Sequence, residues 1–247
     1  MVKDILFDLD ETLFDFKKAE RIALLKTLDF LGLDSQESFV LLYSRINQEM
    51  WKCLERGEIT RQKLKIERFR RFLEEAGLQS DPAQAAAFYE KSLSEGHYYI
   101  DGAEEVVFSL KERYNLYIVS NGTYRVQTGR LSEASITTCF KDIFISEQLG
   151  VNKPSREFFH KCFDRIPGFS RQTAVIVGDS LTSDILGGIN AGIRTIWFNP
   201  SHSQPEGEIV PDYQISSLYQ LDIILENLSH DTRVESQKSF LLAGKDF

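Results

Sequence analysis

The sequence predicts an α/β fold, a doubly wound parallel sheet with an all-α insertion after its first strand. From about residue 99 to 228, short apolar runs rich in β-branched residues alternate with helical stretches. Such alternation gives a parallel sheet with helices on both faces. Residues 16–98 are instead charged and poor in glycine, with apolar residues at helical spacing. The 247 residues, 42% of them hydrophobic, can bury one sizeable core and a smaller one.

The individual elements follow from these patterns. Strands are expected near 3–9, 115–120, 142–146, 173–178, 193–198 and 212–215, and helices near 102–113, 123–134, 155–165, 182–191 and 217–227. Four apolar stripes in the insertion predict about four helices, the last beginning at Asp81-Pro82, a cap followed by a first-turn proline. We expect residues 1–15 and 99–228 to form the sheet domain, 16–98 the helical domain and 229–247 a loosely attached C-terminal tail.

Composition excludes several classes of protein. The net charge of −8 argues against nucleic-acid polymers as partners, because these require a basic face. No apolar run approaches the roughly 20 residues of a membrane span, and the N-terminus lacks the layout of a signal peptide. The three cysteines have no CxxC spacing, which predicts idle thiols and a cytoplasmic protein. We expect a monomer or a homodimer.

Two carboxylates follow the first apolar run, Asp4-Ile-Leu-Phe-Asp-Leu-Asp-Glu-Thr12. The strand period of two places Asp8 and Asp10 on one side and turns Leu9 into the core. Phosphoryl transfer through an enzyme aspartate needs such a pair, one carboxylate to attack phosphorus and one to protonate the leaving oxygen. The alternative is an ordinary strand that ends in an acidic turn.

Polar groups at the ends of later apolar runs favour the chemical interpretation. Ser120 and Asn121 follow one run, Lys153 stands before a proline after the next, and Asp179 and Asp184 follow a third. Ligands of open parallel sheets bind outside the carboxyl ends of the strands. We therefore expect these groups to converge on one place.

Together these residues resemble the four motifs of the haloacid dehalogenase (HAD) superfamily of phosphohydrolases, in the family's order: Asp8-x-Asp10-x-Thr12, Ser120, Lys153 and Gly178-Asp179-x-x-x-x-Asp184. The resemblance spans residues 4–199 and implies a Rossmann-like sheet with the insertion as a helical cap. Within the superfamily the sequence is most similar to the pyrimidine 5'-nucleotidase subgroup, on Gly57–Arg61, Asn121-Gly122 with Gln127-x-x-Arg130-Leu131, and Gly178–Gly192. Less exact matches to these stretches also occur among sugar-phosphate phosphatases.

The resemblance implies a role for each main group. Asp8 is expected to be the nucleophile that forms an aspartyl-phosphate, and Asp10 the general acid and base. The carboxylates of Asp8 and Asp179 and the backbone carbonyl of Asp10 make a hard-oxygen ligand set for Mg²⁺. Lys153 is expected to neutralise charge on the transferring phosphoryl group. A second aspartate together with Asp179 favours phosphate over carbon–halogen chemistry, since dehalogenase relatives need no metal.

Four further residues are expected to support this site. Thr12 either orients Asp10 through its hydroxyl or is an ordinary helix-start threonine. The hydroxyl of Ser120 and the backbone N–H of Asn121 are expected to bind the phosphoryl oxygens of the substrate. Asp184 is expected to hold Lys153 or a metal-bound water rather than the metal itself.

The insertion is less informative. Trp51 and the stretch Arg56–Thr60 interrupt the helical pattern, as either a cap loop whose aromatic ring stacks on a base or a helix connection beside a buried tryptophan. The charged run Glu67–Arg71 is expected to be a solvated helix face. The four histidines lack ligand spacing, and we expect them to be structural or exposed.

The function expected from these features is Mg²⁺-dependent hydrolysis of a small phosphate monoester, in particular of a pyrimidine nucleoside 5'-monophosphate. One alternative keeps the chemistry and changes the substrate to a phosphosugar or phosphoglycolate. Less favoured are a phosphomutase, which needs further phosphate-binding groups, and a non-catalytic binding protein, which has no need of all four charged motif residues.

Overall fold

The computed structural model describes residues 1–204 and 207–228, so the predicted tail at 229–247 lies outside the described residues. These residues divide into two compact units. The sheet unit comprises Met1–Phe14, Tyr99–Tyr124 and the described residues from Ile136 onward. The helical unit comprises Asp15–Tyr98 and Arg125–Ser135. The domain boundaries expected from the sequence stay a prediction, because the two units are defined by packing alone.

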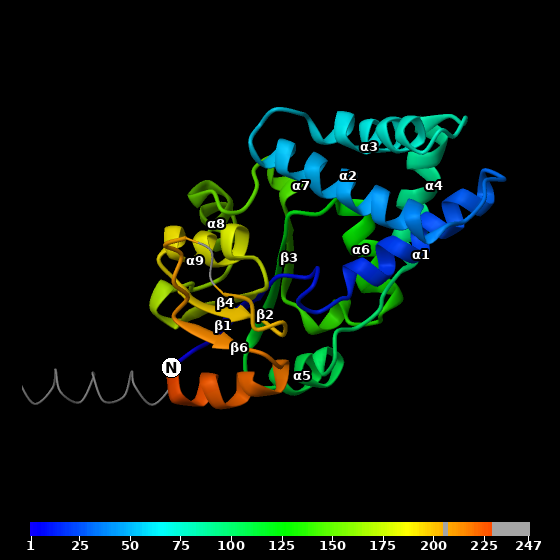
Figure 1. Cartoon of the computed structure of the whole chain (residues 1–247). Coiled ribbons are helices and arrows are strands. Elements are labelled where there is room, and N and C mark those ends of the chain that lie inside the picture. Colours follow the sequence, from blue (N-terminus) through cyan, green and yellow to red (C-terminus); the bar gives the residue numbers. More distant parts are fainter. Residues whose placement is uncertain (205–206, 229–247) are drawn as a thin grey trace, which may run out of the picture. The chain divides into compact units, whose positions relative to one another are not determined.

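The sheet unit contains six parallel strands in the order β3-β2-β1-β4-β5-β6 (Figure 1). Their bounds are β1 Asp4–Phe7, β2 Asn115–Ser120, β3 Asp142–Ile145, β4 Ala174–Gly178, β5 Arg194–Phe198 and β6 Tyr213–Ile215. Every predicted strand is present, and the α/β fold with a parallel sheet is confirmed. The first strand lies at the centre, paired with both β2 and β4. The strand order reverses here, which is the place where ligands bind in such sheets.

Helices cover this sheet as expected from the alternating pattern. They are α5 Ala103–Leu110, α7 Ser146–Leu149, α8 Arg156–Phe163, α9 Leu186–Ala191 and a last helix at 221–228. Side chains of α8 and α9 pack with Leu6 and Ile176 of the sheet in one buried cluster. Gly188 permits this close approach, because a Cβ there would lie 2.6 Å from Ile176.

The predicted helix at 182–191 begins differently from an ordinary helix. Leu181–Ile185 form a π-helical turn, η3, before α9 starts. The backbone N–H groups of Asp184 and Ile185 both donate to the carbonyl of Ser180, at 2.9 and 3.1 Å. Single π turns of this kind are frequent at functional sites, since they redirect side chains.

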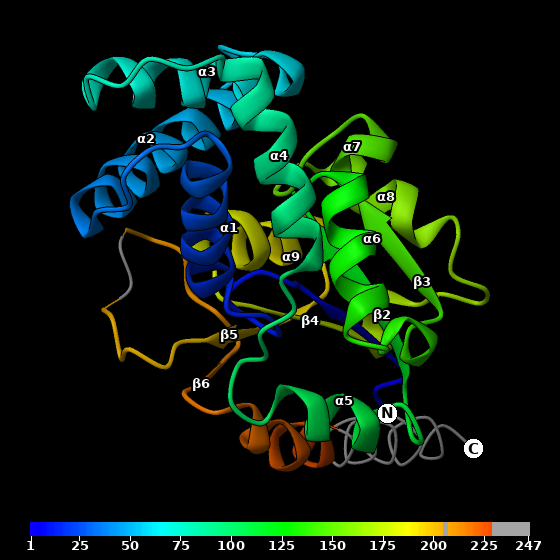
Figure 2. The same ribbon diagram turned by 90° about the vertical axis from the view of Figure 1, so that its right-hand side faces the viewer.

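The helical unit contains the four helices predicted for the insertion, α1 Phe16–Phe30, α2 Glu37–Glu55, α3 Arg61–Glu75 and α4 Pro82–Glu95 (Figure 2). Side-chain caps fix three of the helix starts. The carboxylate of Asp15 accepts from the N–H of Lys18 at 2.8 Å, and the hydroxyl of Thr60 caps α3. Asp81 caps α4 ahead of Pro82, which confirms the predicted start signal. Every helix in the described chain is too short or too polar for a membrane span.

A fifth helix, α6 Tyr124–Glu133, follows β2 in the sequence, and from Arg125 onward it belongs to the helical unit. Its glycine, Gly129, packs against α4, where a Cβ would lie 2.9 Å from Ser94. The fully buried Arg130 donates from Nε to the carbonyl of Gly96 at 2.7 Å. The helical unit is therefore built from two separate stretches of chain.

One prediction about the charged run at 67–71 is wrong. Arg68 is only 4% exposed. It lies four residues after Leu64 and four before Phe72, so helical geometry places it on the buried stripe of α3. Its Nη1 donates to the side chain of Asn47 at 3.0 Å, and Asn47 in turn donates to Glu20 at 2.7 Å. The other charged residues of this run pair with one another at the surface.

Candidate active site

The candidate nucleophile stands at the centre of the sheet unit. Asp8 directly follows β1, and its backbone N–H donates to the carbonyl of Val177 at 2.9 Å. Both neighbours, Phe7 and Leu9, are fully buried, so the strand is anchored in the core on either side. Asp8 as a whole residue is 7% exposed. The backbone ladder thus fixes where this side chain leaves the sheet.

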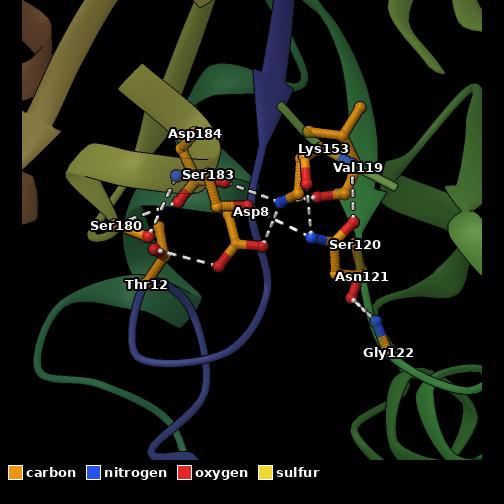
Figure 3. A network of polar contacts seen from close by, with 10 residues as sticks. All are labelled: Asp8, Thr12, Val119, Ser120, Asn121, Gly122, Lys153, Ser180, Ser183 and Asp184. Carbon is orange, nitrogen blue, oxygen red and sulfur yellow. Dashed lines mark hydrogen bonds and ion pairs between the residues drawn. The ribbon is translucent and has the colours of Figure 1, made fainter. Parts of the chain in front are cut away.

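Lys153 joins this carboxylate to a second one (Figure 3). Its Nζ lies 2.6 Å from Oδ1 of Asp8 and 2.6 Å from Oδ1 of Asp184. The third ammonium proton goes to the backbone carbonyl of Val119 at 2.7 Å. The ammonium group has three donors, and all three are used. Lys153 is 2% exposed, so these contacts replace its hydration.

Asp179 completes a group of three carboxylates. Ligand atoms of Asp8, Asp179 and Asp184 all lie within 4.8 Å of one another, the one such acidic group among the residues that the structure describes. Gly178 makes this approach sterically possible, because a Cβ there would lie 2.3 Å from Oδ2 of Asp184. The backbone carbonyl of Asp179 is held by the indole N–H of Trp197 at 2.8 Å. An oxygen-rich set of this kind suits a hard divalent cation.

The electrostatics of this group favour binding of a cation. Burial, followed by the neighbouring charge of Asp184, raises the pKa of Asp8 to about 7 against the lowering effect of Lys153. Burial and the charge of Asp8 also raise the pKa of Asp179 well above its ordinary range. Three carboxylates share one lysine, so a divalent cation would relieve the remaining repulsion.

The segment after Asp8 differs from the sequence prediction in one contact. Thr12 is buried, and its hydroxyl donates to Oδ2 of Asp8 at 3.4 Å rather than to Asp10. The chain turns back tightly here, with Glu11 at a φ of 59° and its N–H donating to the carbonyl of Phe14 at 2.7 Å. This turn brings Thr12 under the carboxylate four residues before it. Asp10 lies near enough for its charge to raise the pKa of Asp8.

The end of β2 lies beside the lysine. Ser120 is 1% exposed, and its hydroxyl accepts from the N–H of Gly122 at 3.1 Å. The side chain of Asn121 bonds to the backbone of Lys153 and to Ser183. Sequence reasoning did not find the carbonyl of Val119 or the hydroxyl of Ser183, because a backbone group and a common serine give no pattern of their own.

Trp51 and the stretch that follows it lie in the helical unit. Trp51 is half-buried on α2, with the guanidinium of Arg61 5.4 Å from its ring centroid. Residues 56–60 connect α2 to α3, and Arg56 pairs there with Glu58 at 2.6 Å. The base-stacking role of Trp51 stays a prediction.

The three cysteines are free thiols, two of them buried and Cys53 half-buried. Burial raises the pKa of the Cys162 and Cys139 thiols, so neither is activated as a nucleophile. The expectation of idle thiols agrees with this chemistry.

The protein is an α/β protein with a Rossmann-like parallel sheet, an all-α insertion after the first strand, and a carboxylate–lysine group at the carboxyl ends of the strands. The family model of haloacid dehalogenase-like hydrolases matches residues 5–198. The chain belongs to this family.

Two relatives by sequence are pyrimidine 5'-nucleotidases. The chain is 40% identical over 229 residues to the pyrimidine 5'-nucleotidase PynA of Streptococcus pneumoniae, which covers 92% of this chain and 96% of PynA. It is 32% identical over 225 residues to the pyrimidine 5'-nucleotidase YjjG of Escherichia coli, covering 90% and 96% of the two chains.

The HAD-hydrolase YfnB of Bacillus subtilis is similar in both sequence and structure. It is 40% identical over 223 residues, covering 90% of this chain and 95% of YfnB. Its crystal structure, determined bound to magnesium, matches with a TM-score of 0.86 over 91% of this chain and 98% of that one. The fold prediction is confirmed independently of the individual site residues.

Proposed function

We propose that this protein hydrolyses phosphate monoesters through an aspartyl-phosphate on Asp8, with pyrimidine nucleoside 5'-monophosphates as its substrates. The observation that carries the proposal is the contact of Lys153 with both Asp8 and Asp184, 2.6 Å each, beside a third carboxylate. A buried ammonium at this place supplies positive charge to a phosphoryl group. The binding partner of the protein is then a small phosphate ester, and a cytoplasmic location of the protein agrees with such a substrate.

The residues present fit a magnesium ion. Asp8, Asp179 and Asp184 offer only oxygen ligands and lie within 4.8 Å of one another, and Mg²⁺ prefers such a set together with water and phosphate oxygens. We assign Asp8, Asp179 and the backbone carbonyl of Asp10 to the ion, and Asp184 to Lys153. When bound, magnesium neutralises charge between the nucleophile and the phosphate. The magnesium-bound structure of the relative YfnB supports magnesium as the ion.

The reaction proceeds in two displacements. A carboxylate oxygen of Asp8 attacks phosphorus, the bond from phosphorus to the ester oxygen breaks, and Asp10 gives its proton to that oxygen. Asp10 then takes a proton from water as the water attacks the aspartyl-phosphate, which releases inorganic phosphate and restores the carboxylate of Asp8 and the protonated form of Asp10. General acid–base assistance of this kind is worth about 10²–10⁴ in rate.

The remaining groups hold the phosphoryl oxygens and the nucleophile. Lys153, the hydroxyl of Ser120 and the backbone N–H of Asn121 stabilise the negative charge on the phosphoryl oxygens. Thr12 donates to Asp8 and so limits the rotation of its carboxylate. Asp184 holds the ammonium of Lys153 in place by its ion pair. Each of these roles can be tested by substituting the residue concerned.

The choice of nucleotide rests on the relatives PynA and YjjG, both pyrimidine 5'-nucleotidases. A phosphosugar or phosphoglycolate is the alternative for the same chemistry. The test is a panel of esters with and without magnesium: p-nitrophenyl phosphate, UMP, dUMP, hexose phosphates and phosphoglycolate. We expect turnover only with magnesium, and kcat/KM highest for UMP or dUMP.

An Asp8→Asn variant, purified in the same way, is the matched control for contaminating phosphatase. Turnover of p-nitrophenyl phosphate that is equal with and without magnesium would contradict the mechanism. A higher kcat/KM for a hexose phosphate or phosphoglycolate would keep the mechanism and replace the nucleotide assignment.

A further inference from the structure

The lysine at the centre of the site is carried by a segment without regular structure. Lys153 lies between α7, which ends at Leu149, and α8, which begins at Arg156. Its own N–H and C=O therefore have no helix or strand partner. Buried backbone groups of this kind need hydrogen bonds from elsewhere. The position of the ammonium depends on them, because a lysine side chain is long and flexible.

A single side chain satisfies both backbone groups of this lysine. The backbone N–H of Lys153 donates to Oδ1 of Asn121 at 2.8 Å, and Nδ2 of Asn121 donates to the carbonyl of Lys153 at 3.0 Å (Figure 3). These two bonds fix the orientation of the amide. If it were flipped, Nδ2 would face the N–H of Lys153, donor against donor, and Oδ1 would face its carbonyl, acceptor against acceptor. Asn121 thus bonds to both the N–H and the C=O of Lys153, as the backbone of a neighbouring strand would do.

The same amide also reaches the turn that carries the second carboxylate. Nδ2 of Asn121 donates to the hydroxyl of Ser183 at 3.2 Å, and Ser183 precedes Asp184 in η3. Both Nδ2 protons are thereby directed to protein acceptors, and Oδ1 faces a protein donor. The side chain therefore connects the end of β2, the segment of Lys153 and the middle of η3.

We propose that the side chain of Asn121 is a positioning residue, which holds the backbone of Lys153 so that its ammonium stays between Asp8 and Asp184. The side chain acts through the lysine, whereas the backbone N–H of Asn121 is the group proposed above to bind the phosphoryl oxygens. The kinetic consequence of this inference rests on the proposed function, whereas the structural consequence does not.

The chain offers a matched control on the same segment. Nδ2 of Asn190, on α9, donates to the carbonyl of Pro154 at 3.1 Å. Asn190→Ala therefore removes an amide-to-backbone bond one residue from Lys153 without touching the groups that Asn121 holds. Asn121→Ala keeps the backbone N–H of residue 121 and removes only the side-chain bonds.

The deciding experiment labels lysines with an amine-reactive ester in the absence of substrate and follows Lys153 by peptide mass spectrometry. We expect Asn121→Ala to raise the labelling rate of Lys153 about tenfold, since two backbone hydrogen bonds that oppose local opening are lost. Asn190→Ala should leave this rate within about threefold of the wild type. A residue that only contacts substrate has no effect here, so unchanged labelling in Asn121→Ala would overturn the inference.

Circular dichroism melting shows whether each variant is folded at the labelling temperature. Should Asn121→Ala be unfolded there, Asn121→Asp takes its place, because a carboxylate still accepts from the N–H of Lys153 but loses both donors. Raised labelling in the folded Asn121→Asp variant would support the inference. Labelling at the wild-type rate would overturn it.

A kinetic arm separates this inference from the proposed function. With p-nitrophenyl phosphate and magnesium, Asn121→Ala should lower kcat about tenfold or more, and Asn190→Ala less than about threefold. A wild-type kcat in Asn121→Ala would overturn the positioning role. Absence of turnover in the wild type itself would instead overturn the proposed function, while the labelling result still decides what Asn121 does.

Discussion

Lys153 of the sheet unit and Arg68 of the helical unit are both buried cations, but they are compensated in different ways. Lys153 contacts two carboxylates directly, with Asp179 close by as a third. Arg68 is linked to the carboxylate of Glu20 through the amide of Asn47. It also packs against an aromatic ring, with its guanidinium 4.8 Å from the centroid of Tyr89.

This difference teaches which kind of buried charge marks a reactive site. Around Lys153 the carboxylates outnumber the cation, and burial and repulsion raise the pKa of Asp8 and of Asp179. Around Arg68 the link to Glu20 runs through the neutral amide of Asn47, and the one group of three close carboxylates in the described chain is the one beside Lys153. An excess of one sign, rather than burial alone, predicts that a ligand completes the group.

The largest expected effect comes from replacing Asp8, the carboxylate at the centre of the group around Lys153. Asp8→Asn should lower kcat for p-nitrophenyl phosphate by about 10⁴-fold or more, because the attacking carboxylate is gone. The pKa of Asp8 is raised, so its ionised form costs folding stability at a pH above about 7. The melting temperature of the variant at pH 8 should therefore be no lower than that of the wild type. Turnover near the wild-type value would mean that the nucleophile lies elsewhere.

A smaller effect separates the two carboxylates that flank Asp8. Asp179→Asn should raise the magnesium concentration for half-maximal turnover by about tenfold or more, since a direct ligand is weakened. Asp184→Asn should lower kcat through Lys153 and shift this concentration less. Magnesium titrations of turnover measure both. Equal shifts in the two variants would place Asp184 on the ion as well.

The helical unit provides the contrasting case. Arg68→Met should lower the free energy of unfolding by about 2–3 kcal/mol, because Asn47 and Glu20 lose their buried cationic partner. Glu20→Gln combined with Arg68→Met should cost less than the sum of the two single changes. Urea unfolding followed by circular dichroism gives these values. An additive double variant would show that Glu20 and Arg68 do not compensate each other.

The smallest effect comes from an exposed arginine of the same unit. Arg45 pairs with Glu75 at 2.6 Å, but its side chain is 53% exposed. Arg45→Met should change the free energy of unfolding by no more than about 0.5 kcal/mol, since solvent screens such pairs. The measurement is the urea unfolding used for Arg68→Met. Equal losses at positions 45 and 68 would remove the distinction between buried and exposed arginines.

Much of the sheet unit was predictable because the strand pattern and the polar groups that follow it are both local in sequence. Asp8, Lys153, Asp179 and Asp184 each follow their own apolar run, and parallel strands bring such ends to one edge. The contact of the Thr12 hydroxyl with Asp8 matches neither interpretation considered for Thr12, because the tight turn at Glu11 is not visible in residue spacing.

The contacts that sequence reasoning missed are those between a side chain and a distant backbone. Asn121 pairs with the backbone of a residue 32 positions later, and backbone groups are the same at every position. Arg68 is a different case, since its spacing from Leu64 and Phe72 did contain the signal. The charge of the surrounding run concealed it, and only the helical period distinguishes Arg68 from its solvated neighbours.

The two-part origin of the helical unit has a consequence for exchanging it between relatives. A graft of Asp15–Tyr98 alone would take Gly96 without Arg130 and Ser94 without Gly129, so the transplanted piece would meet a foreign helix at both contacts. Specificity chimeras should therefore carry Arg125–Ser135 from the same donor. The two stretches form one structural unit that has to be exchanged together, although 26 residues separate them in the chain, from Tyr99 to Tyr124.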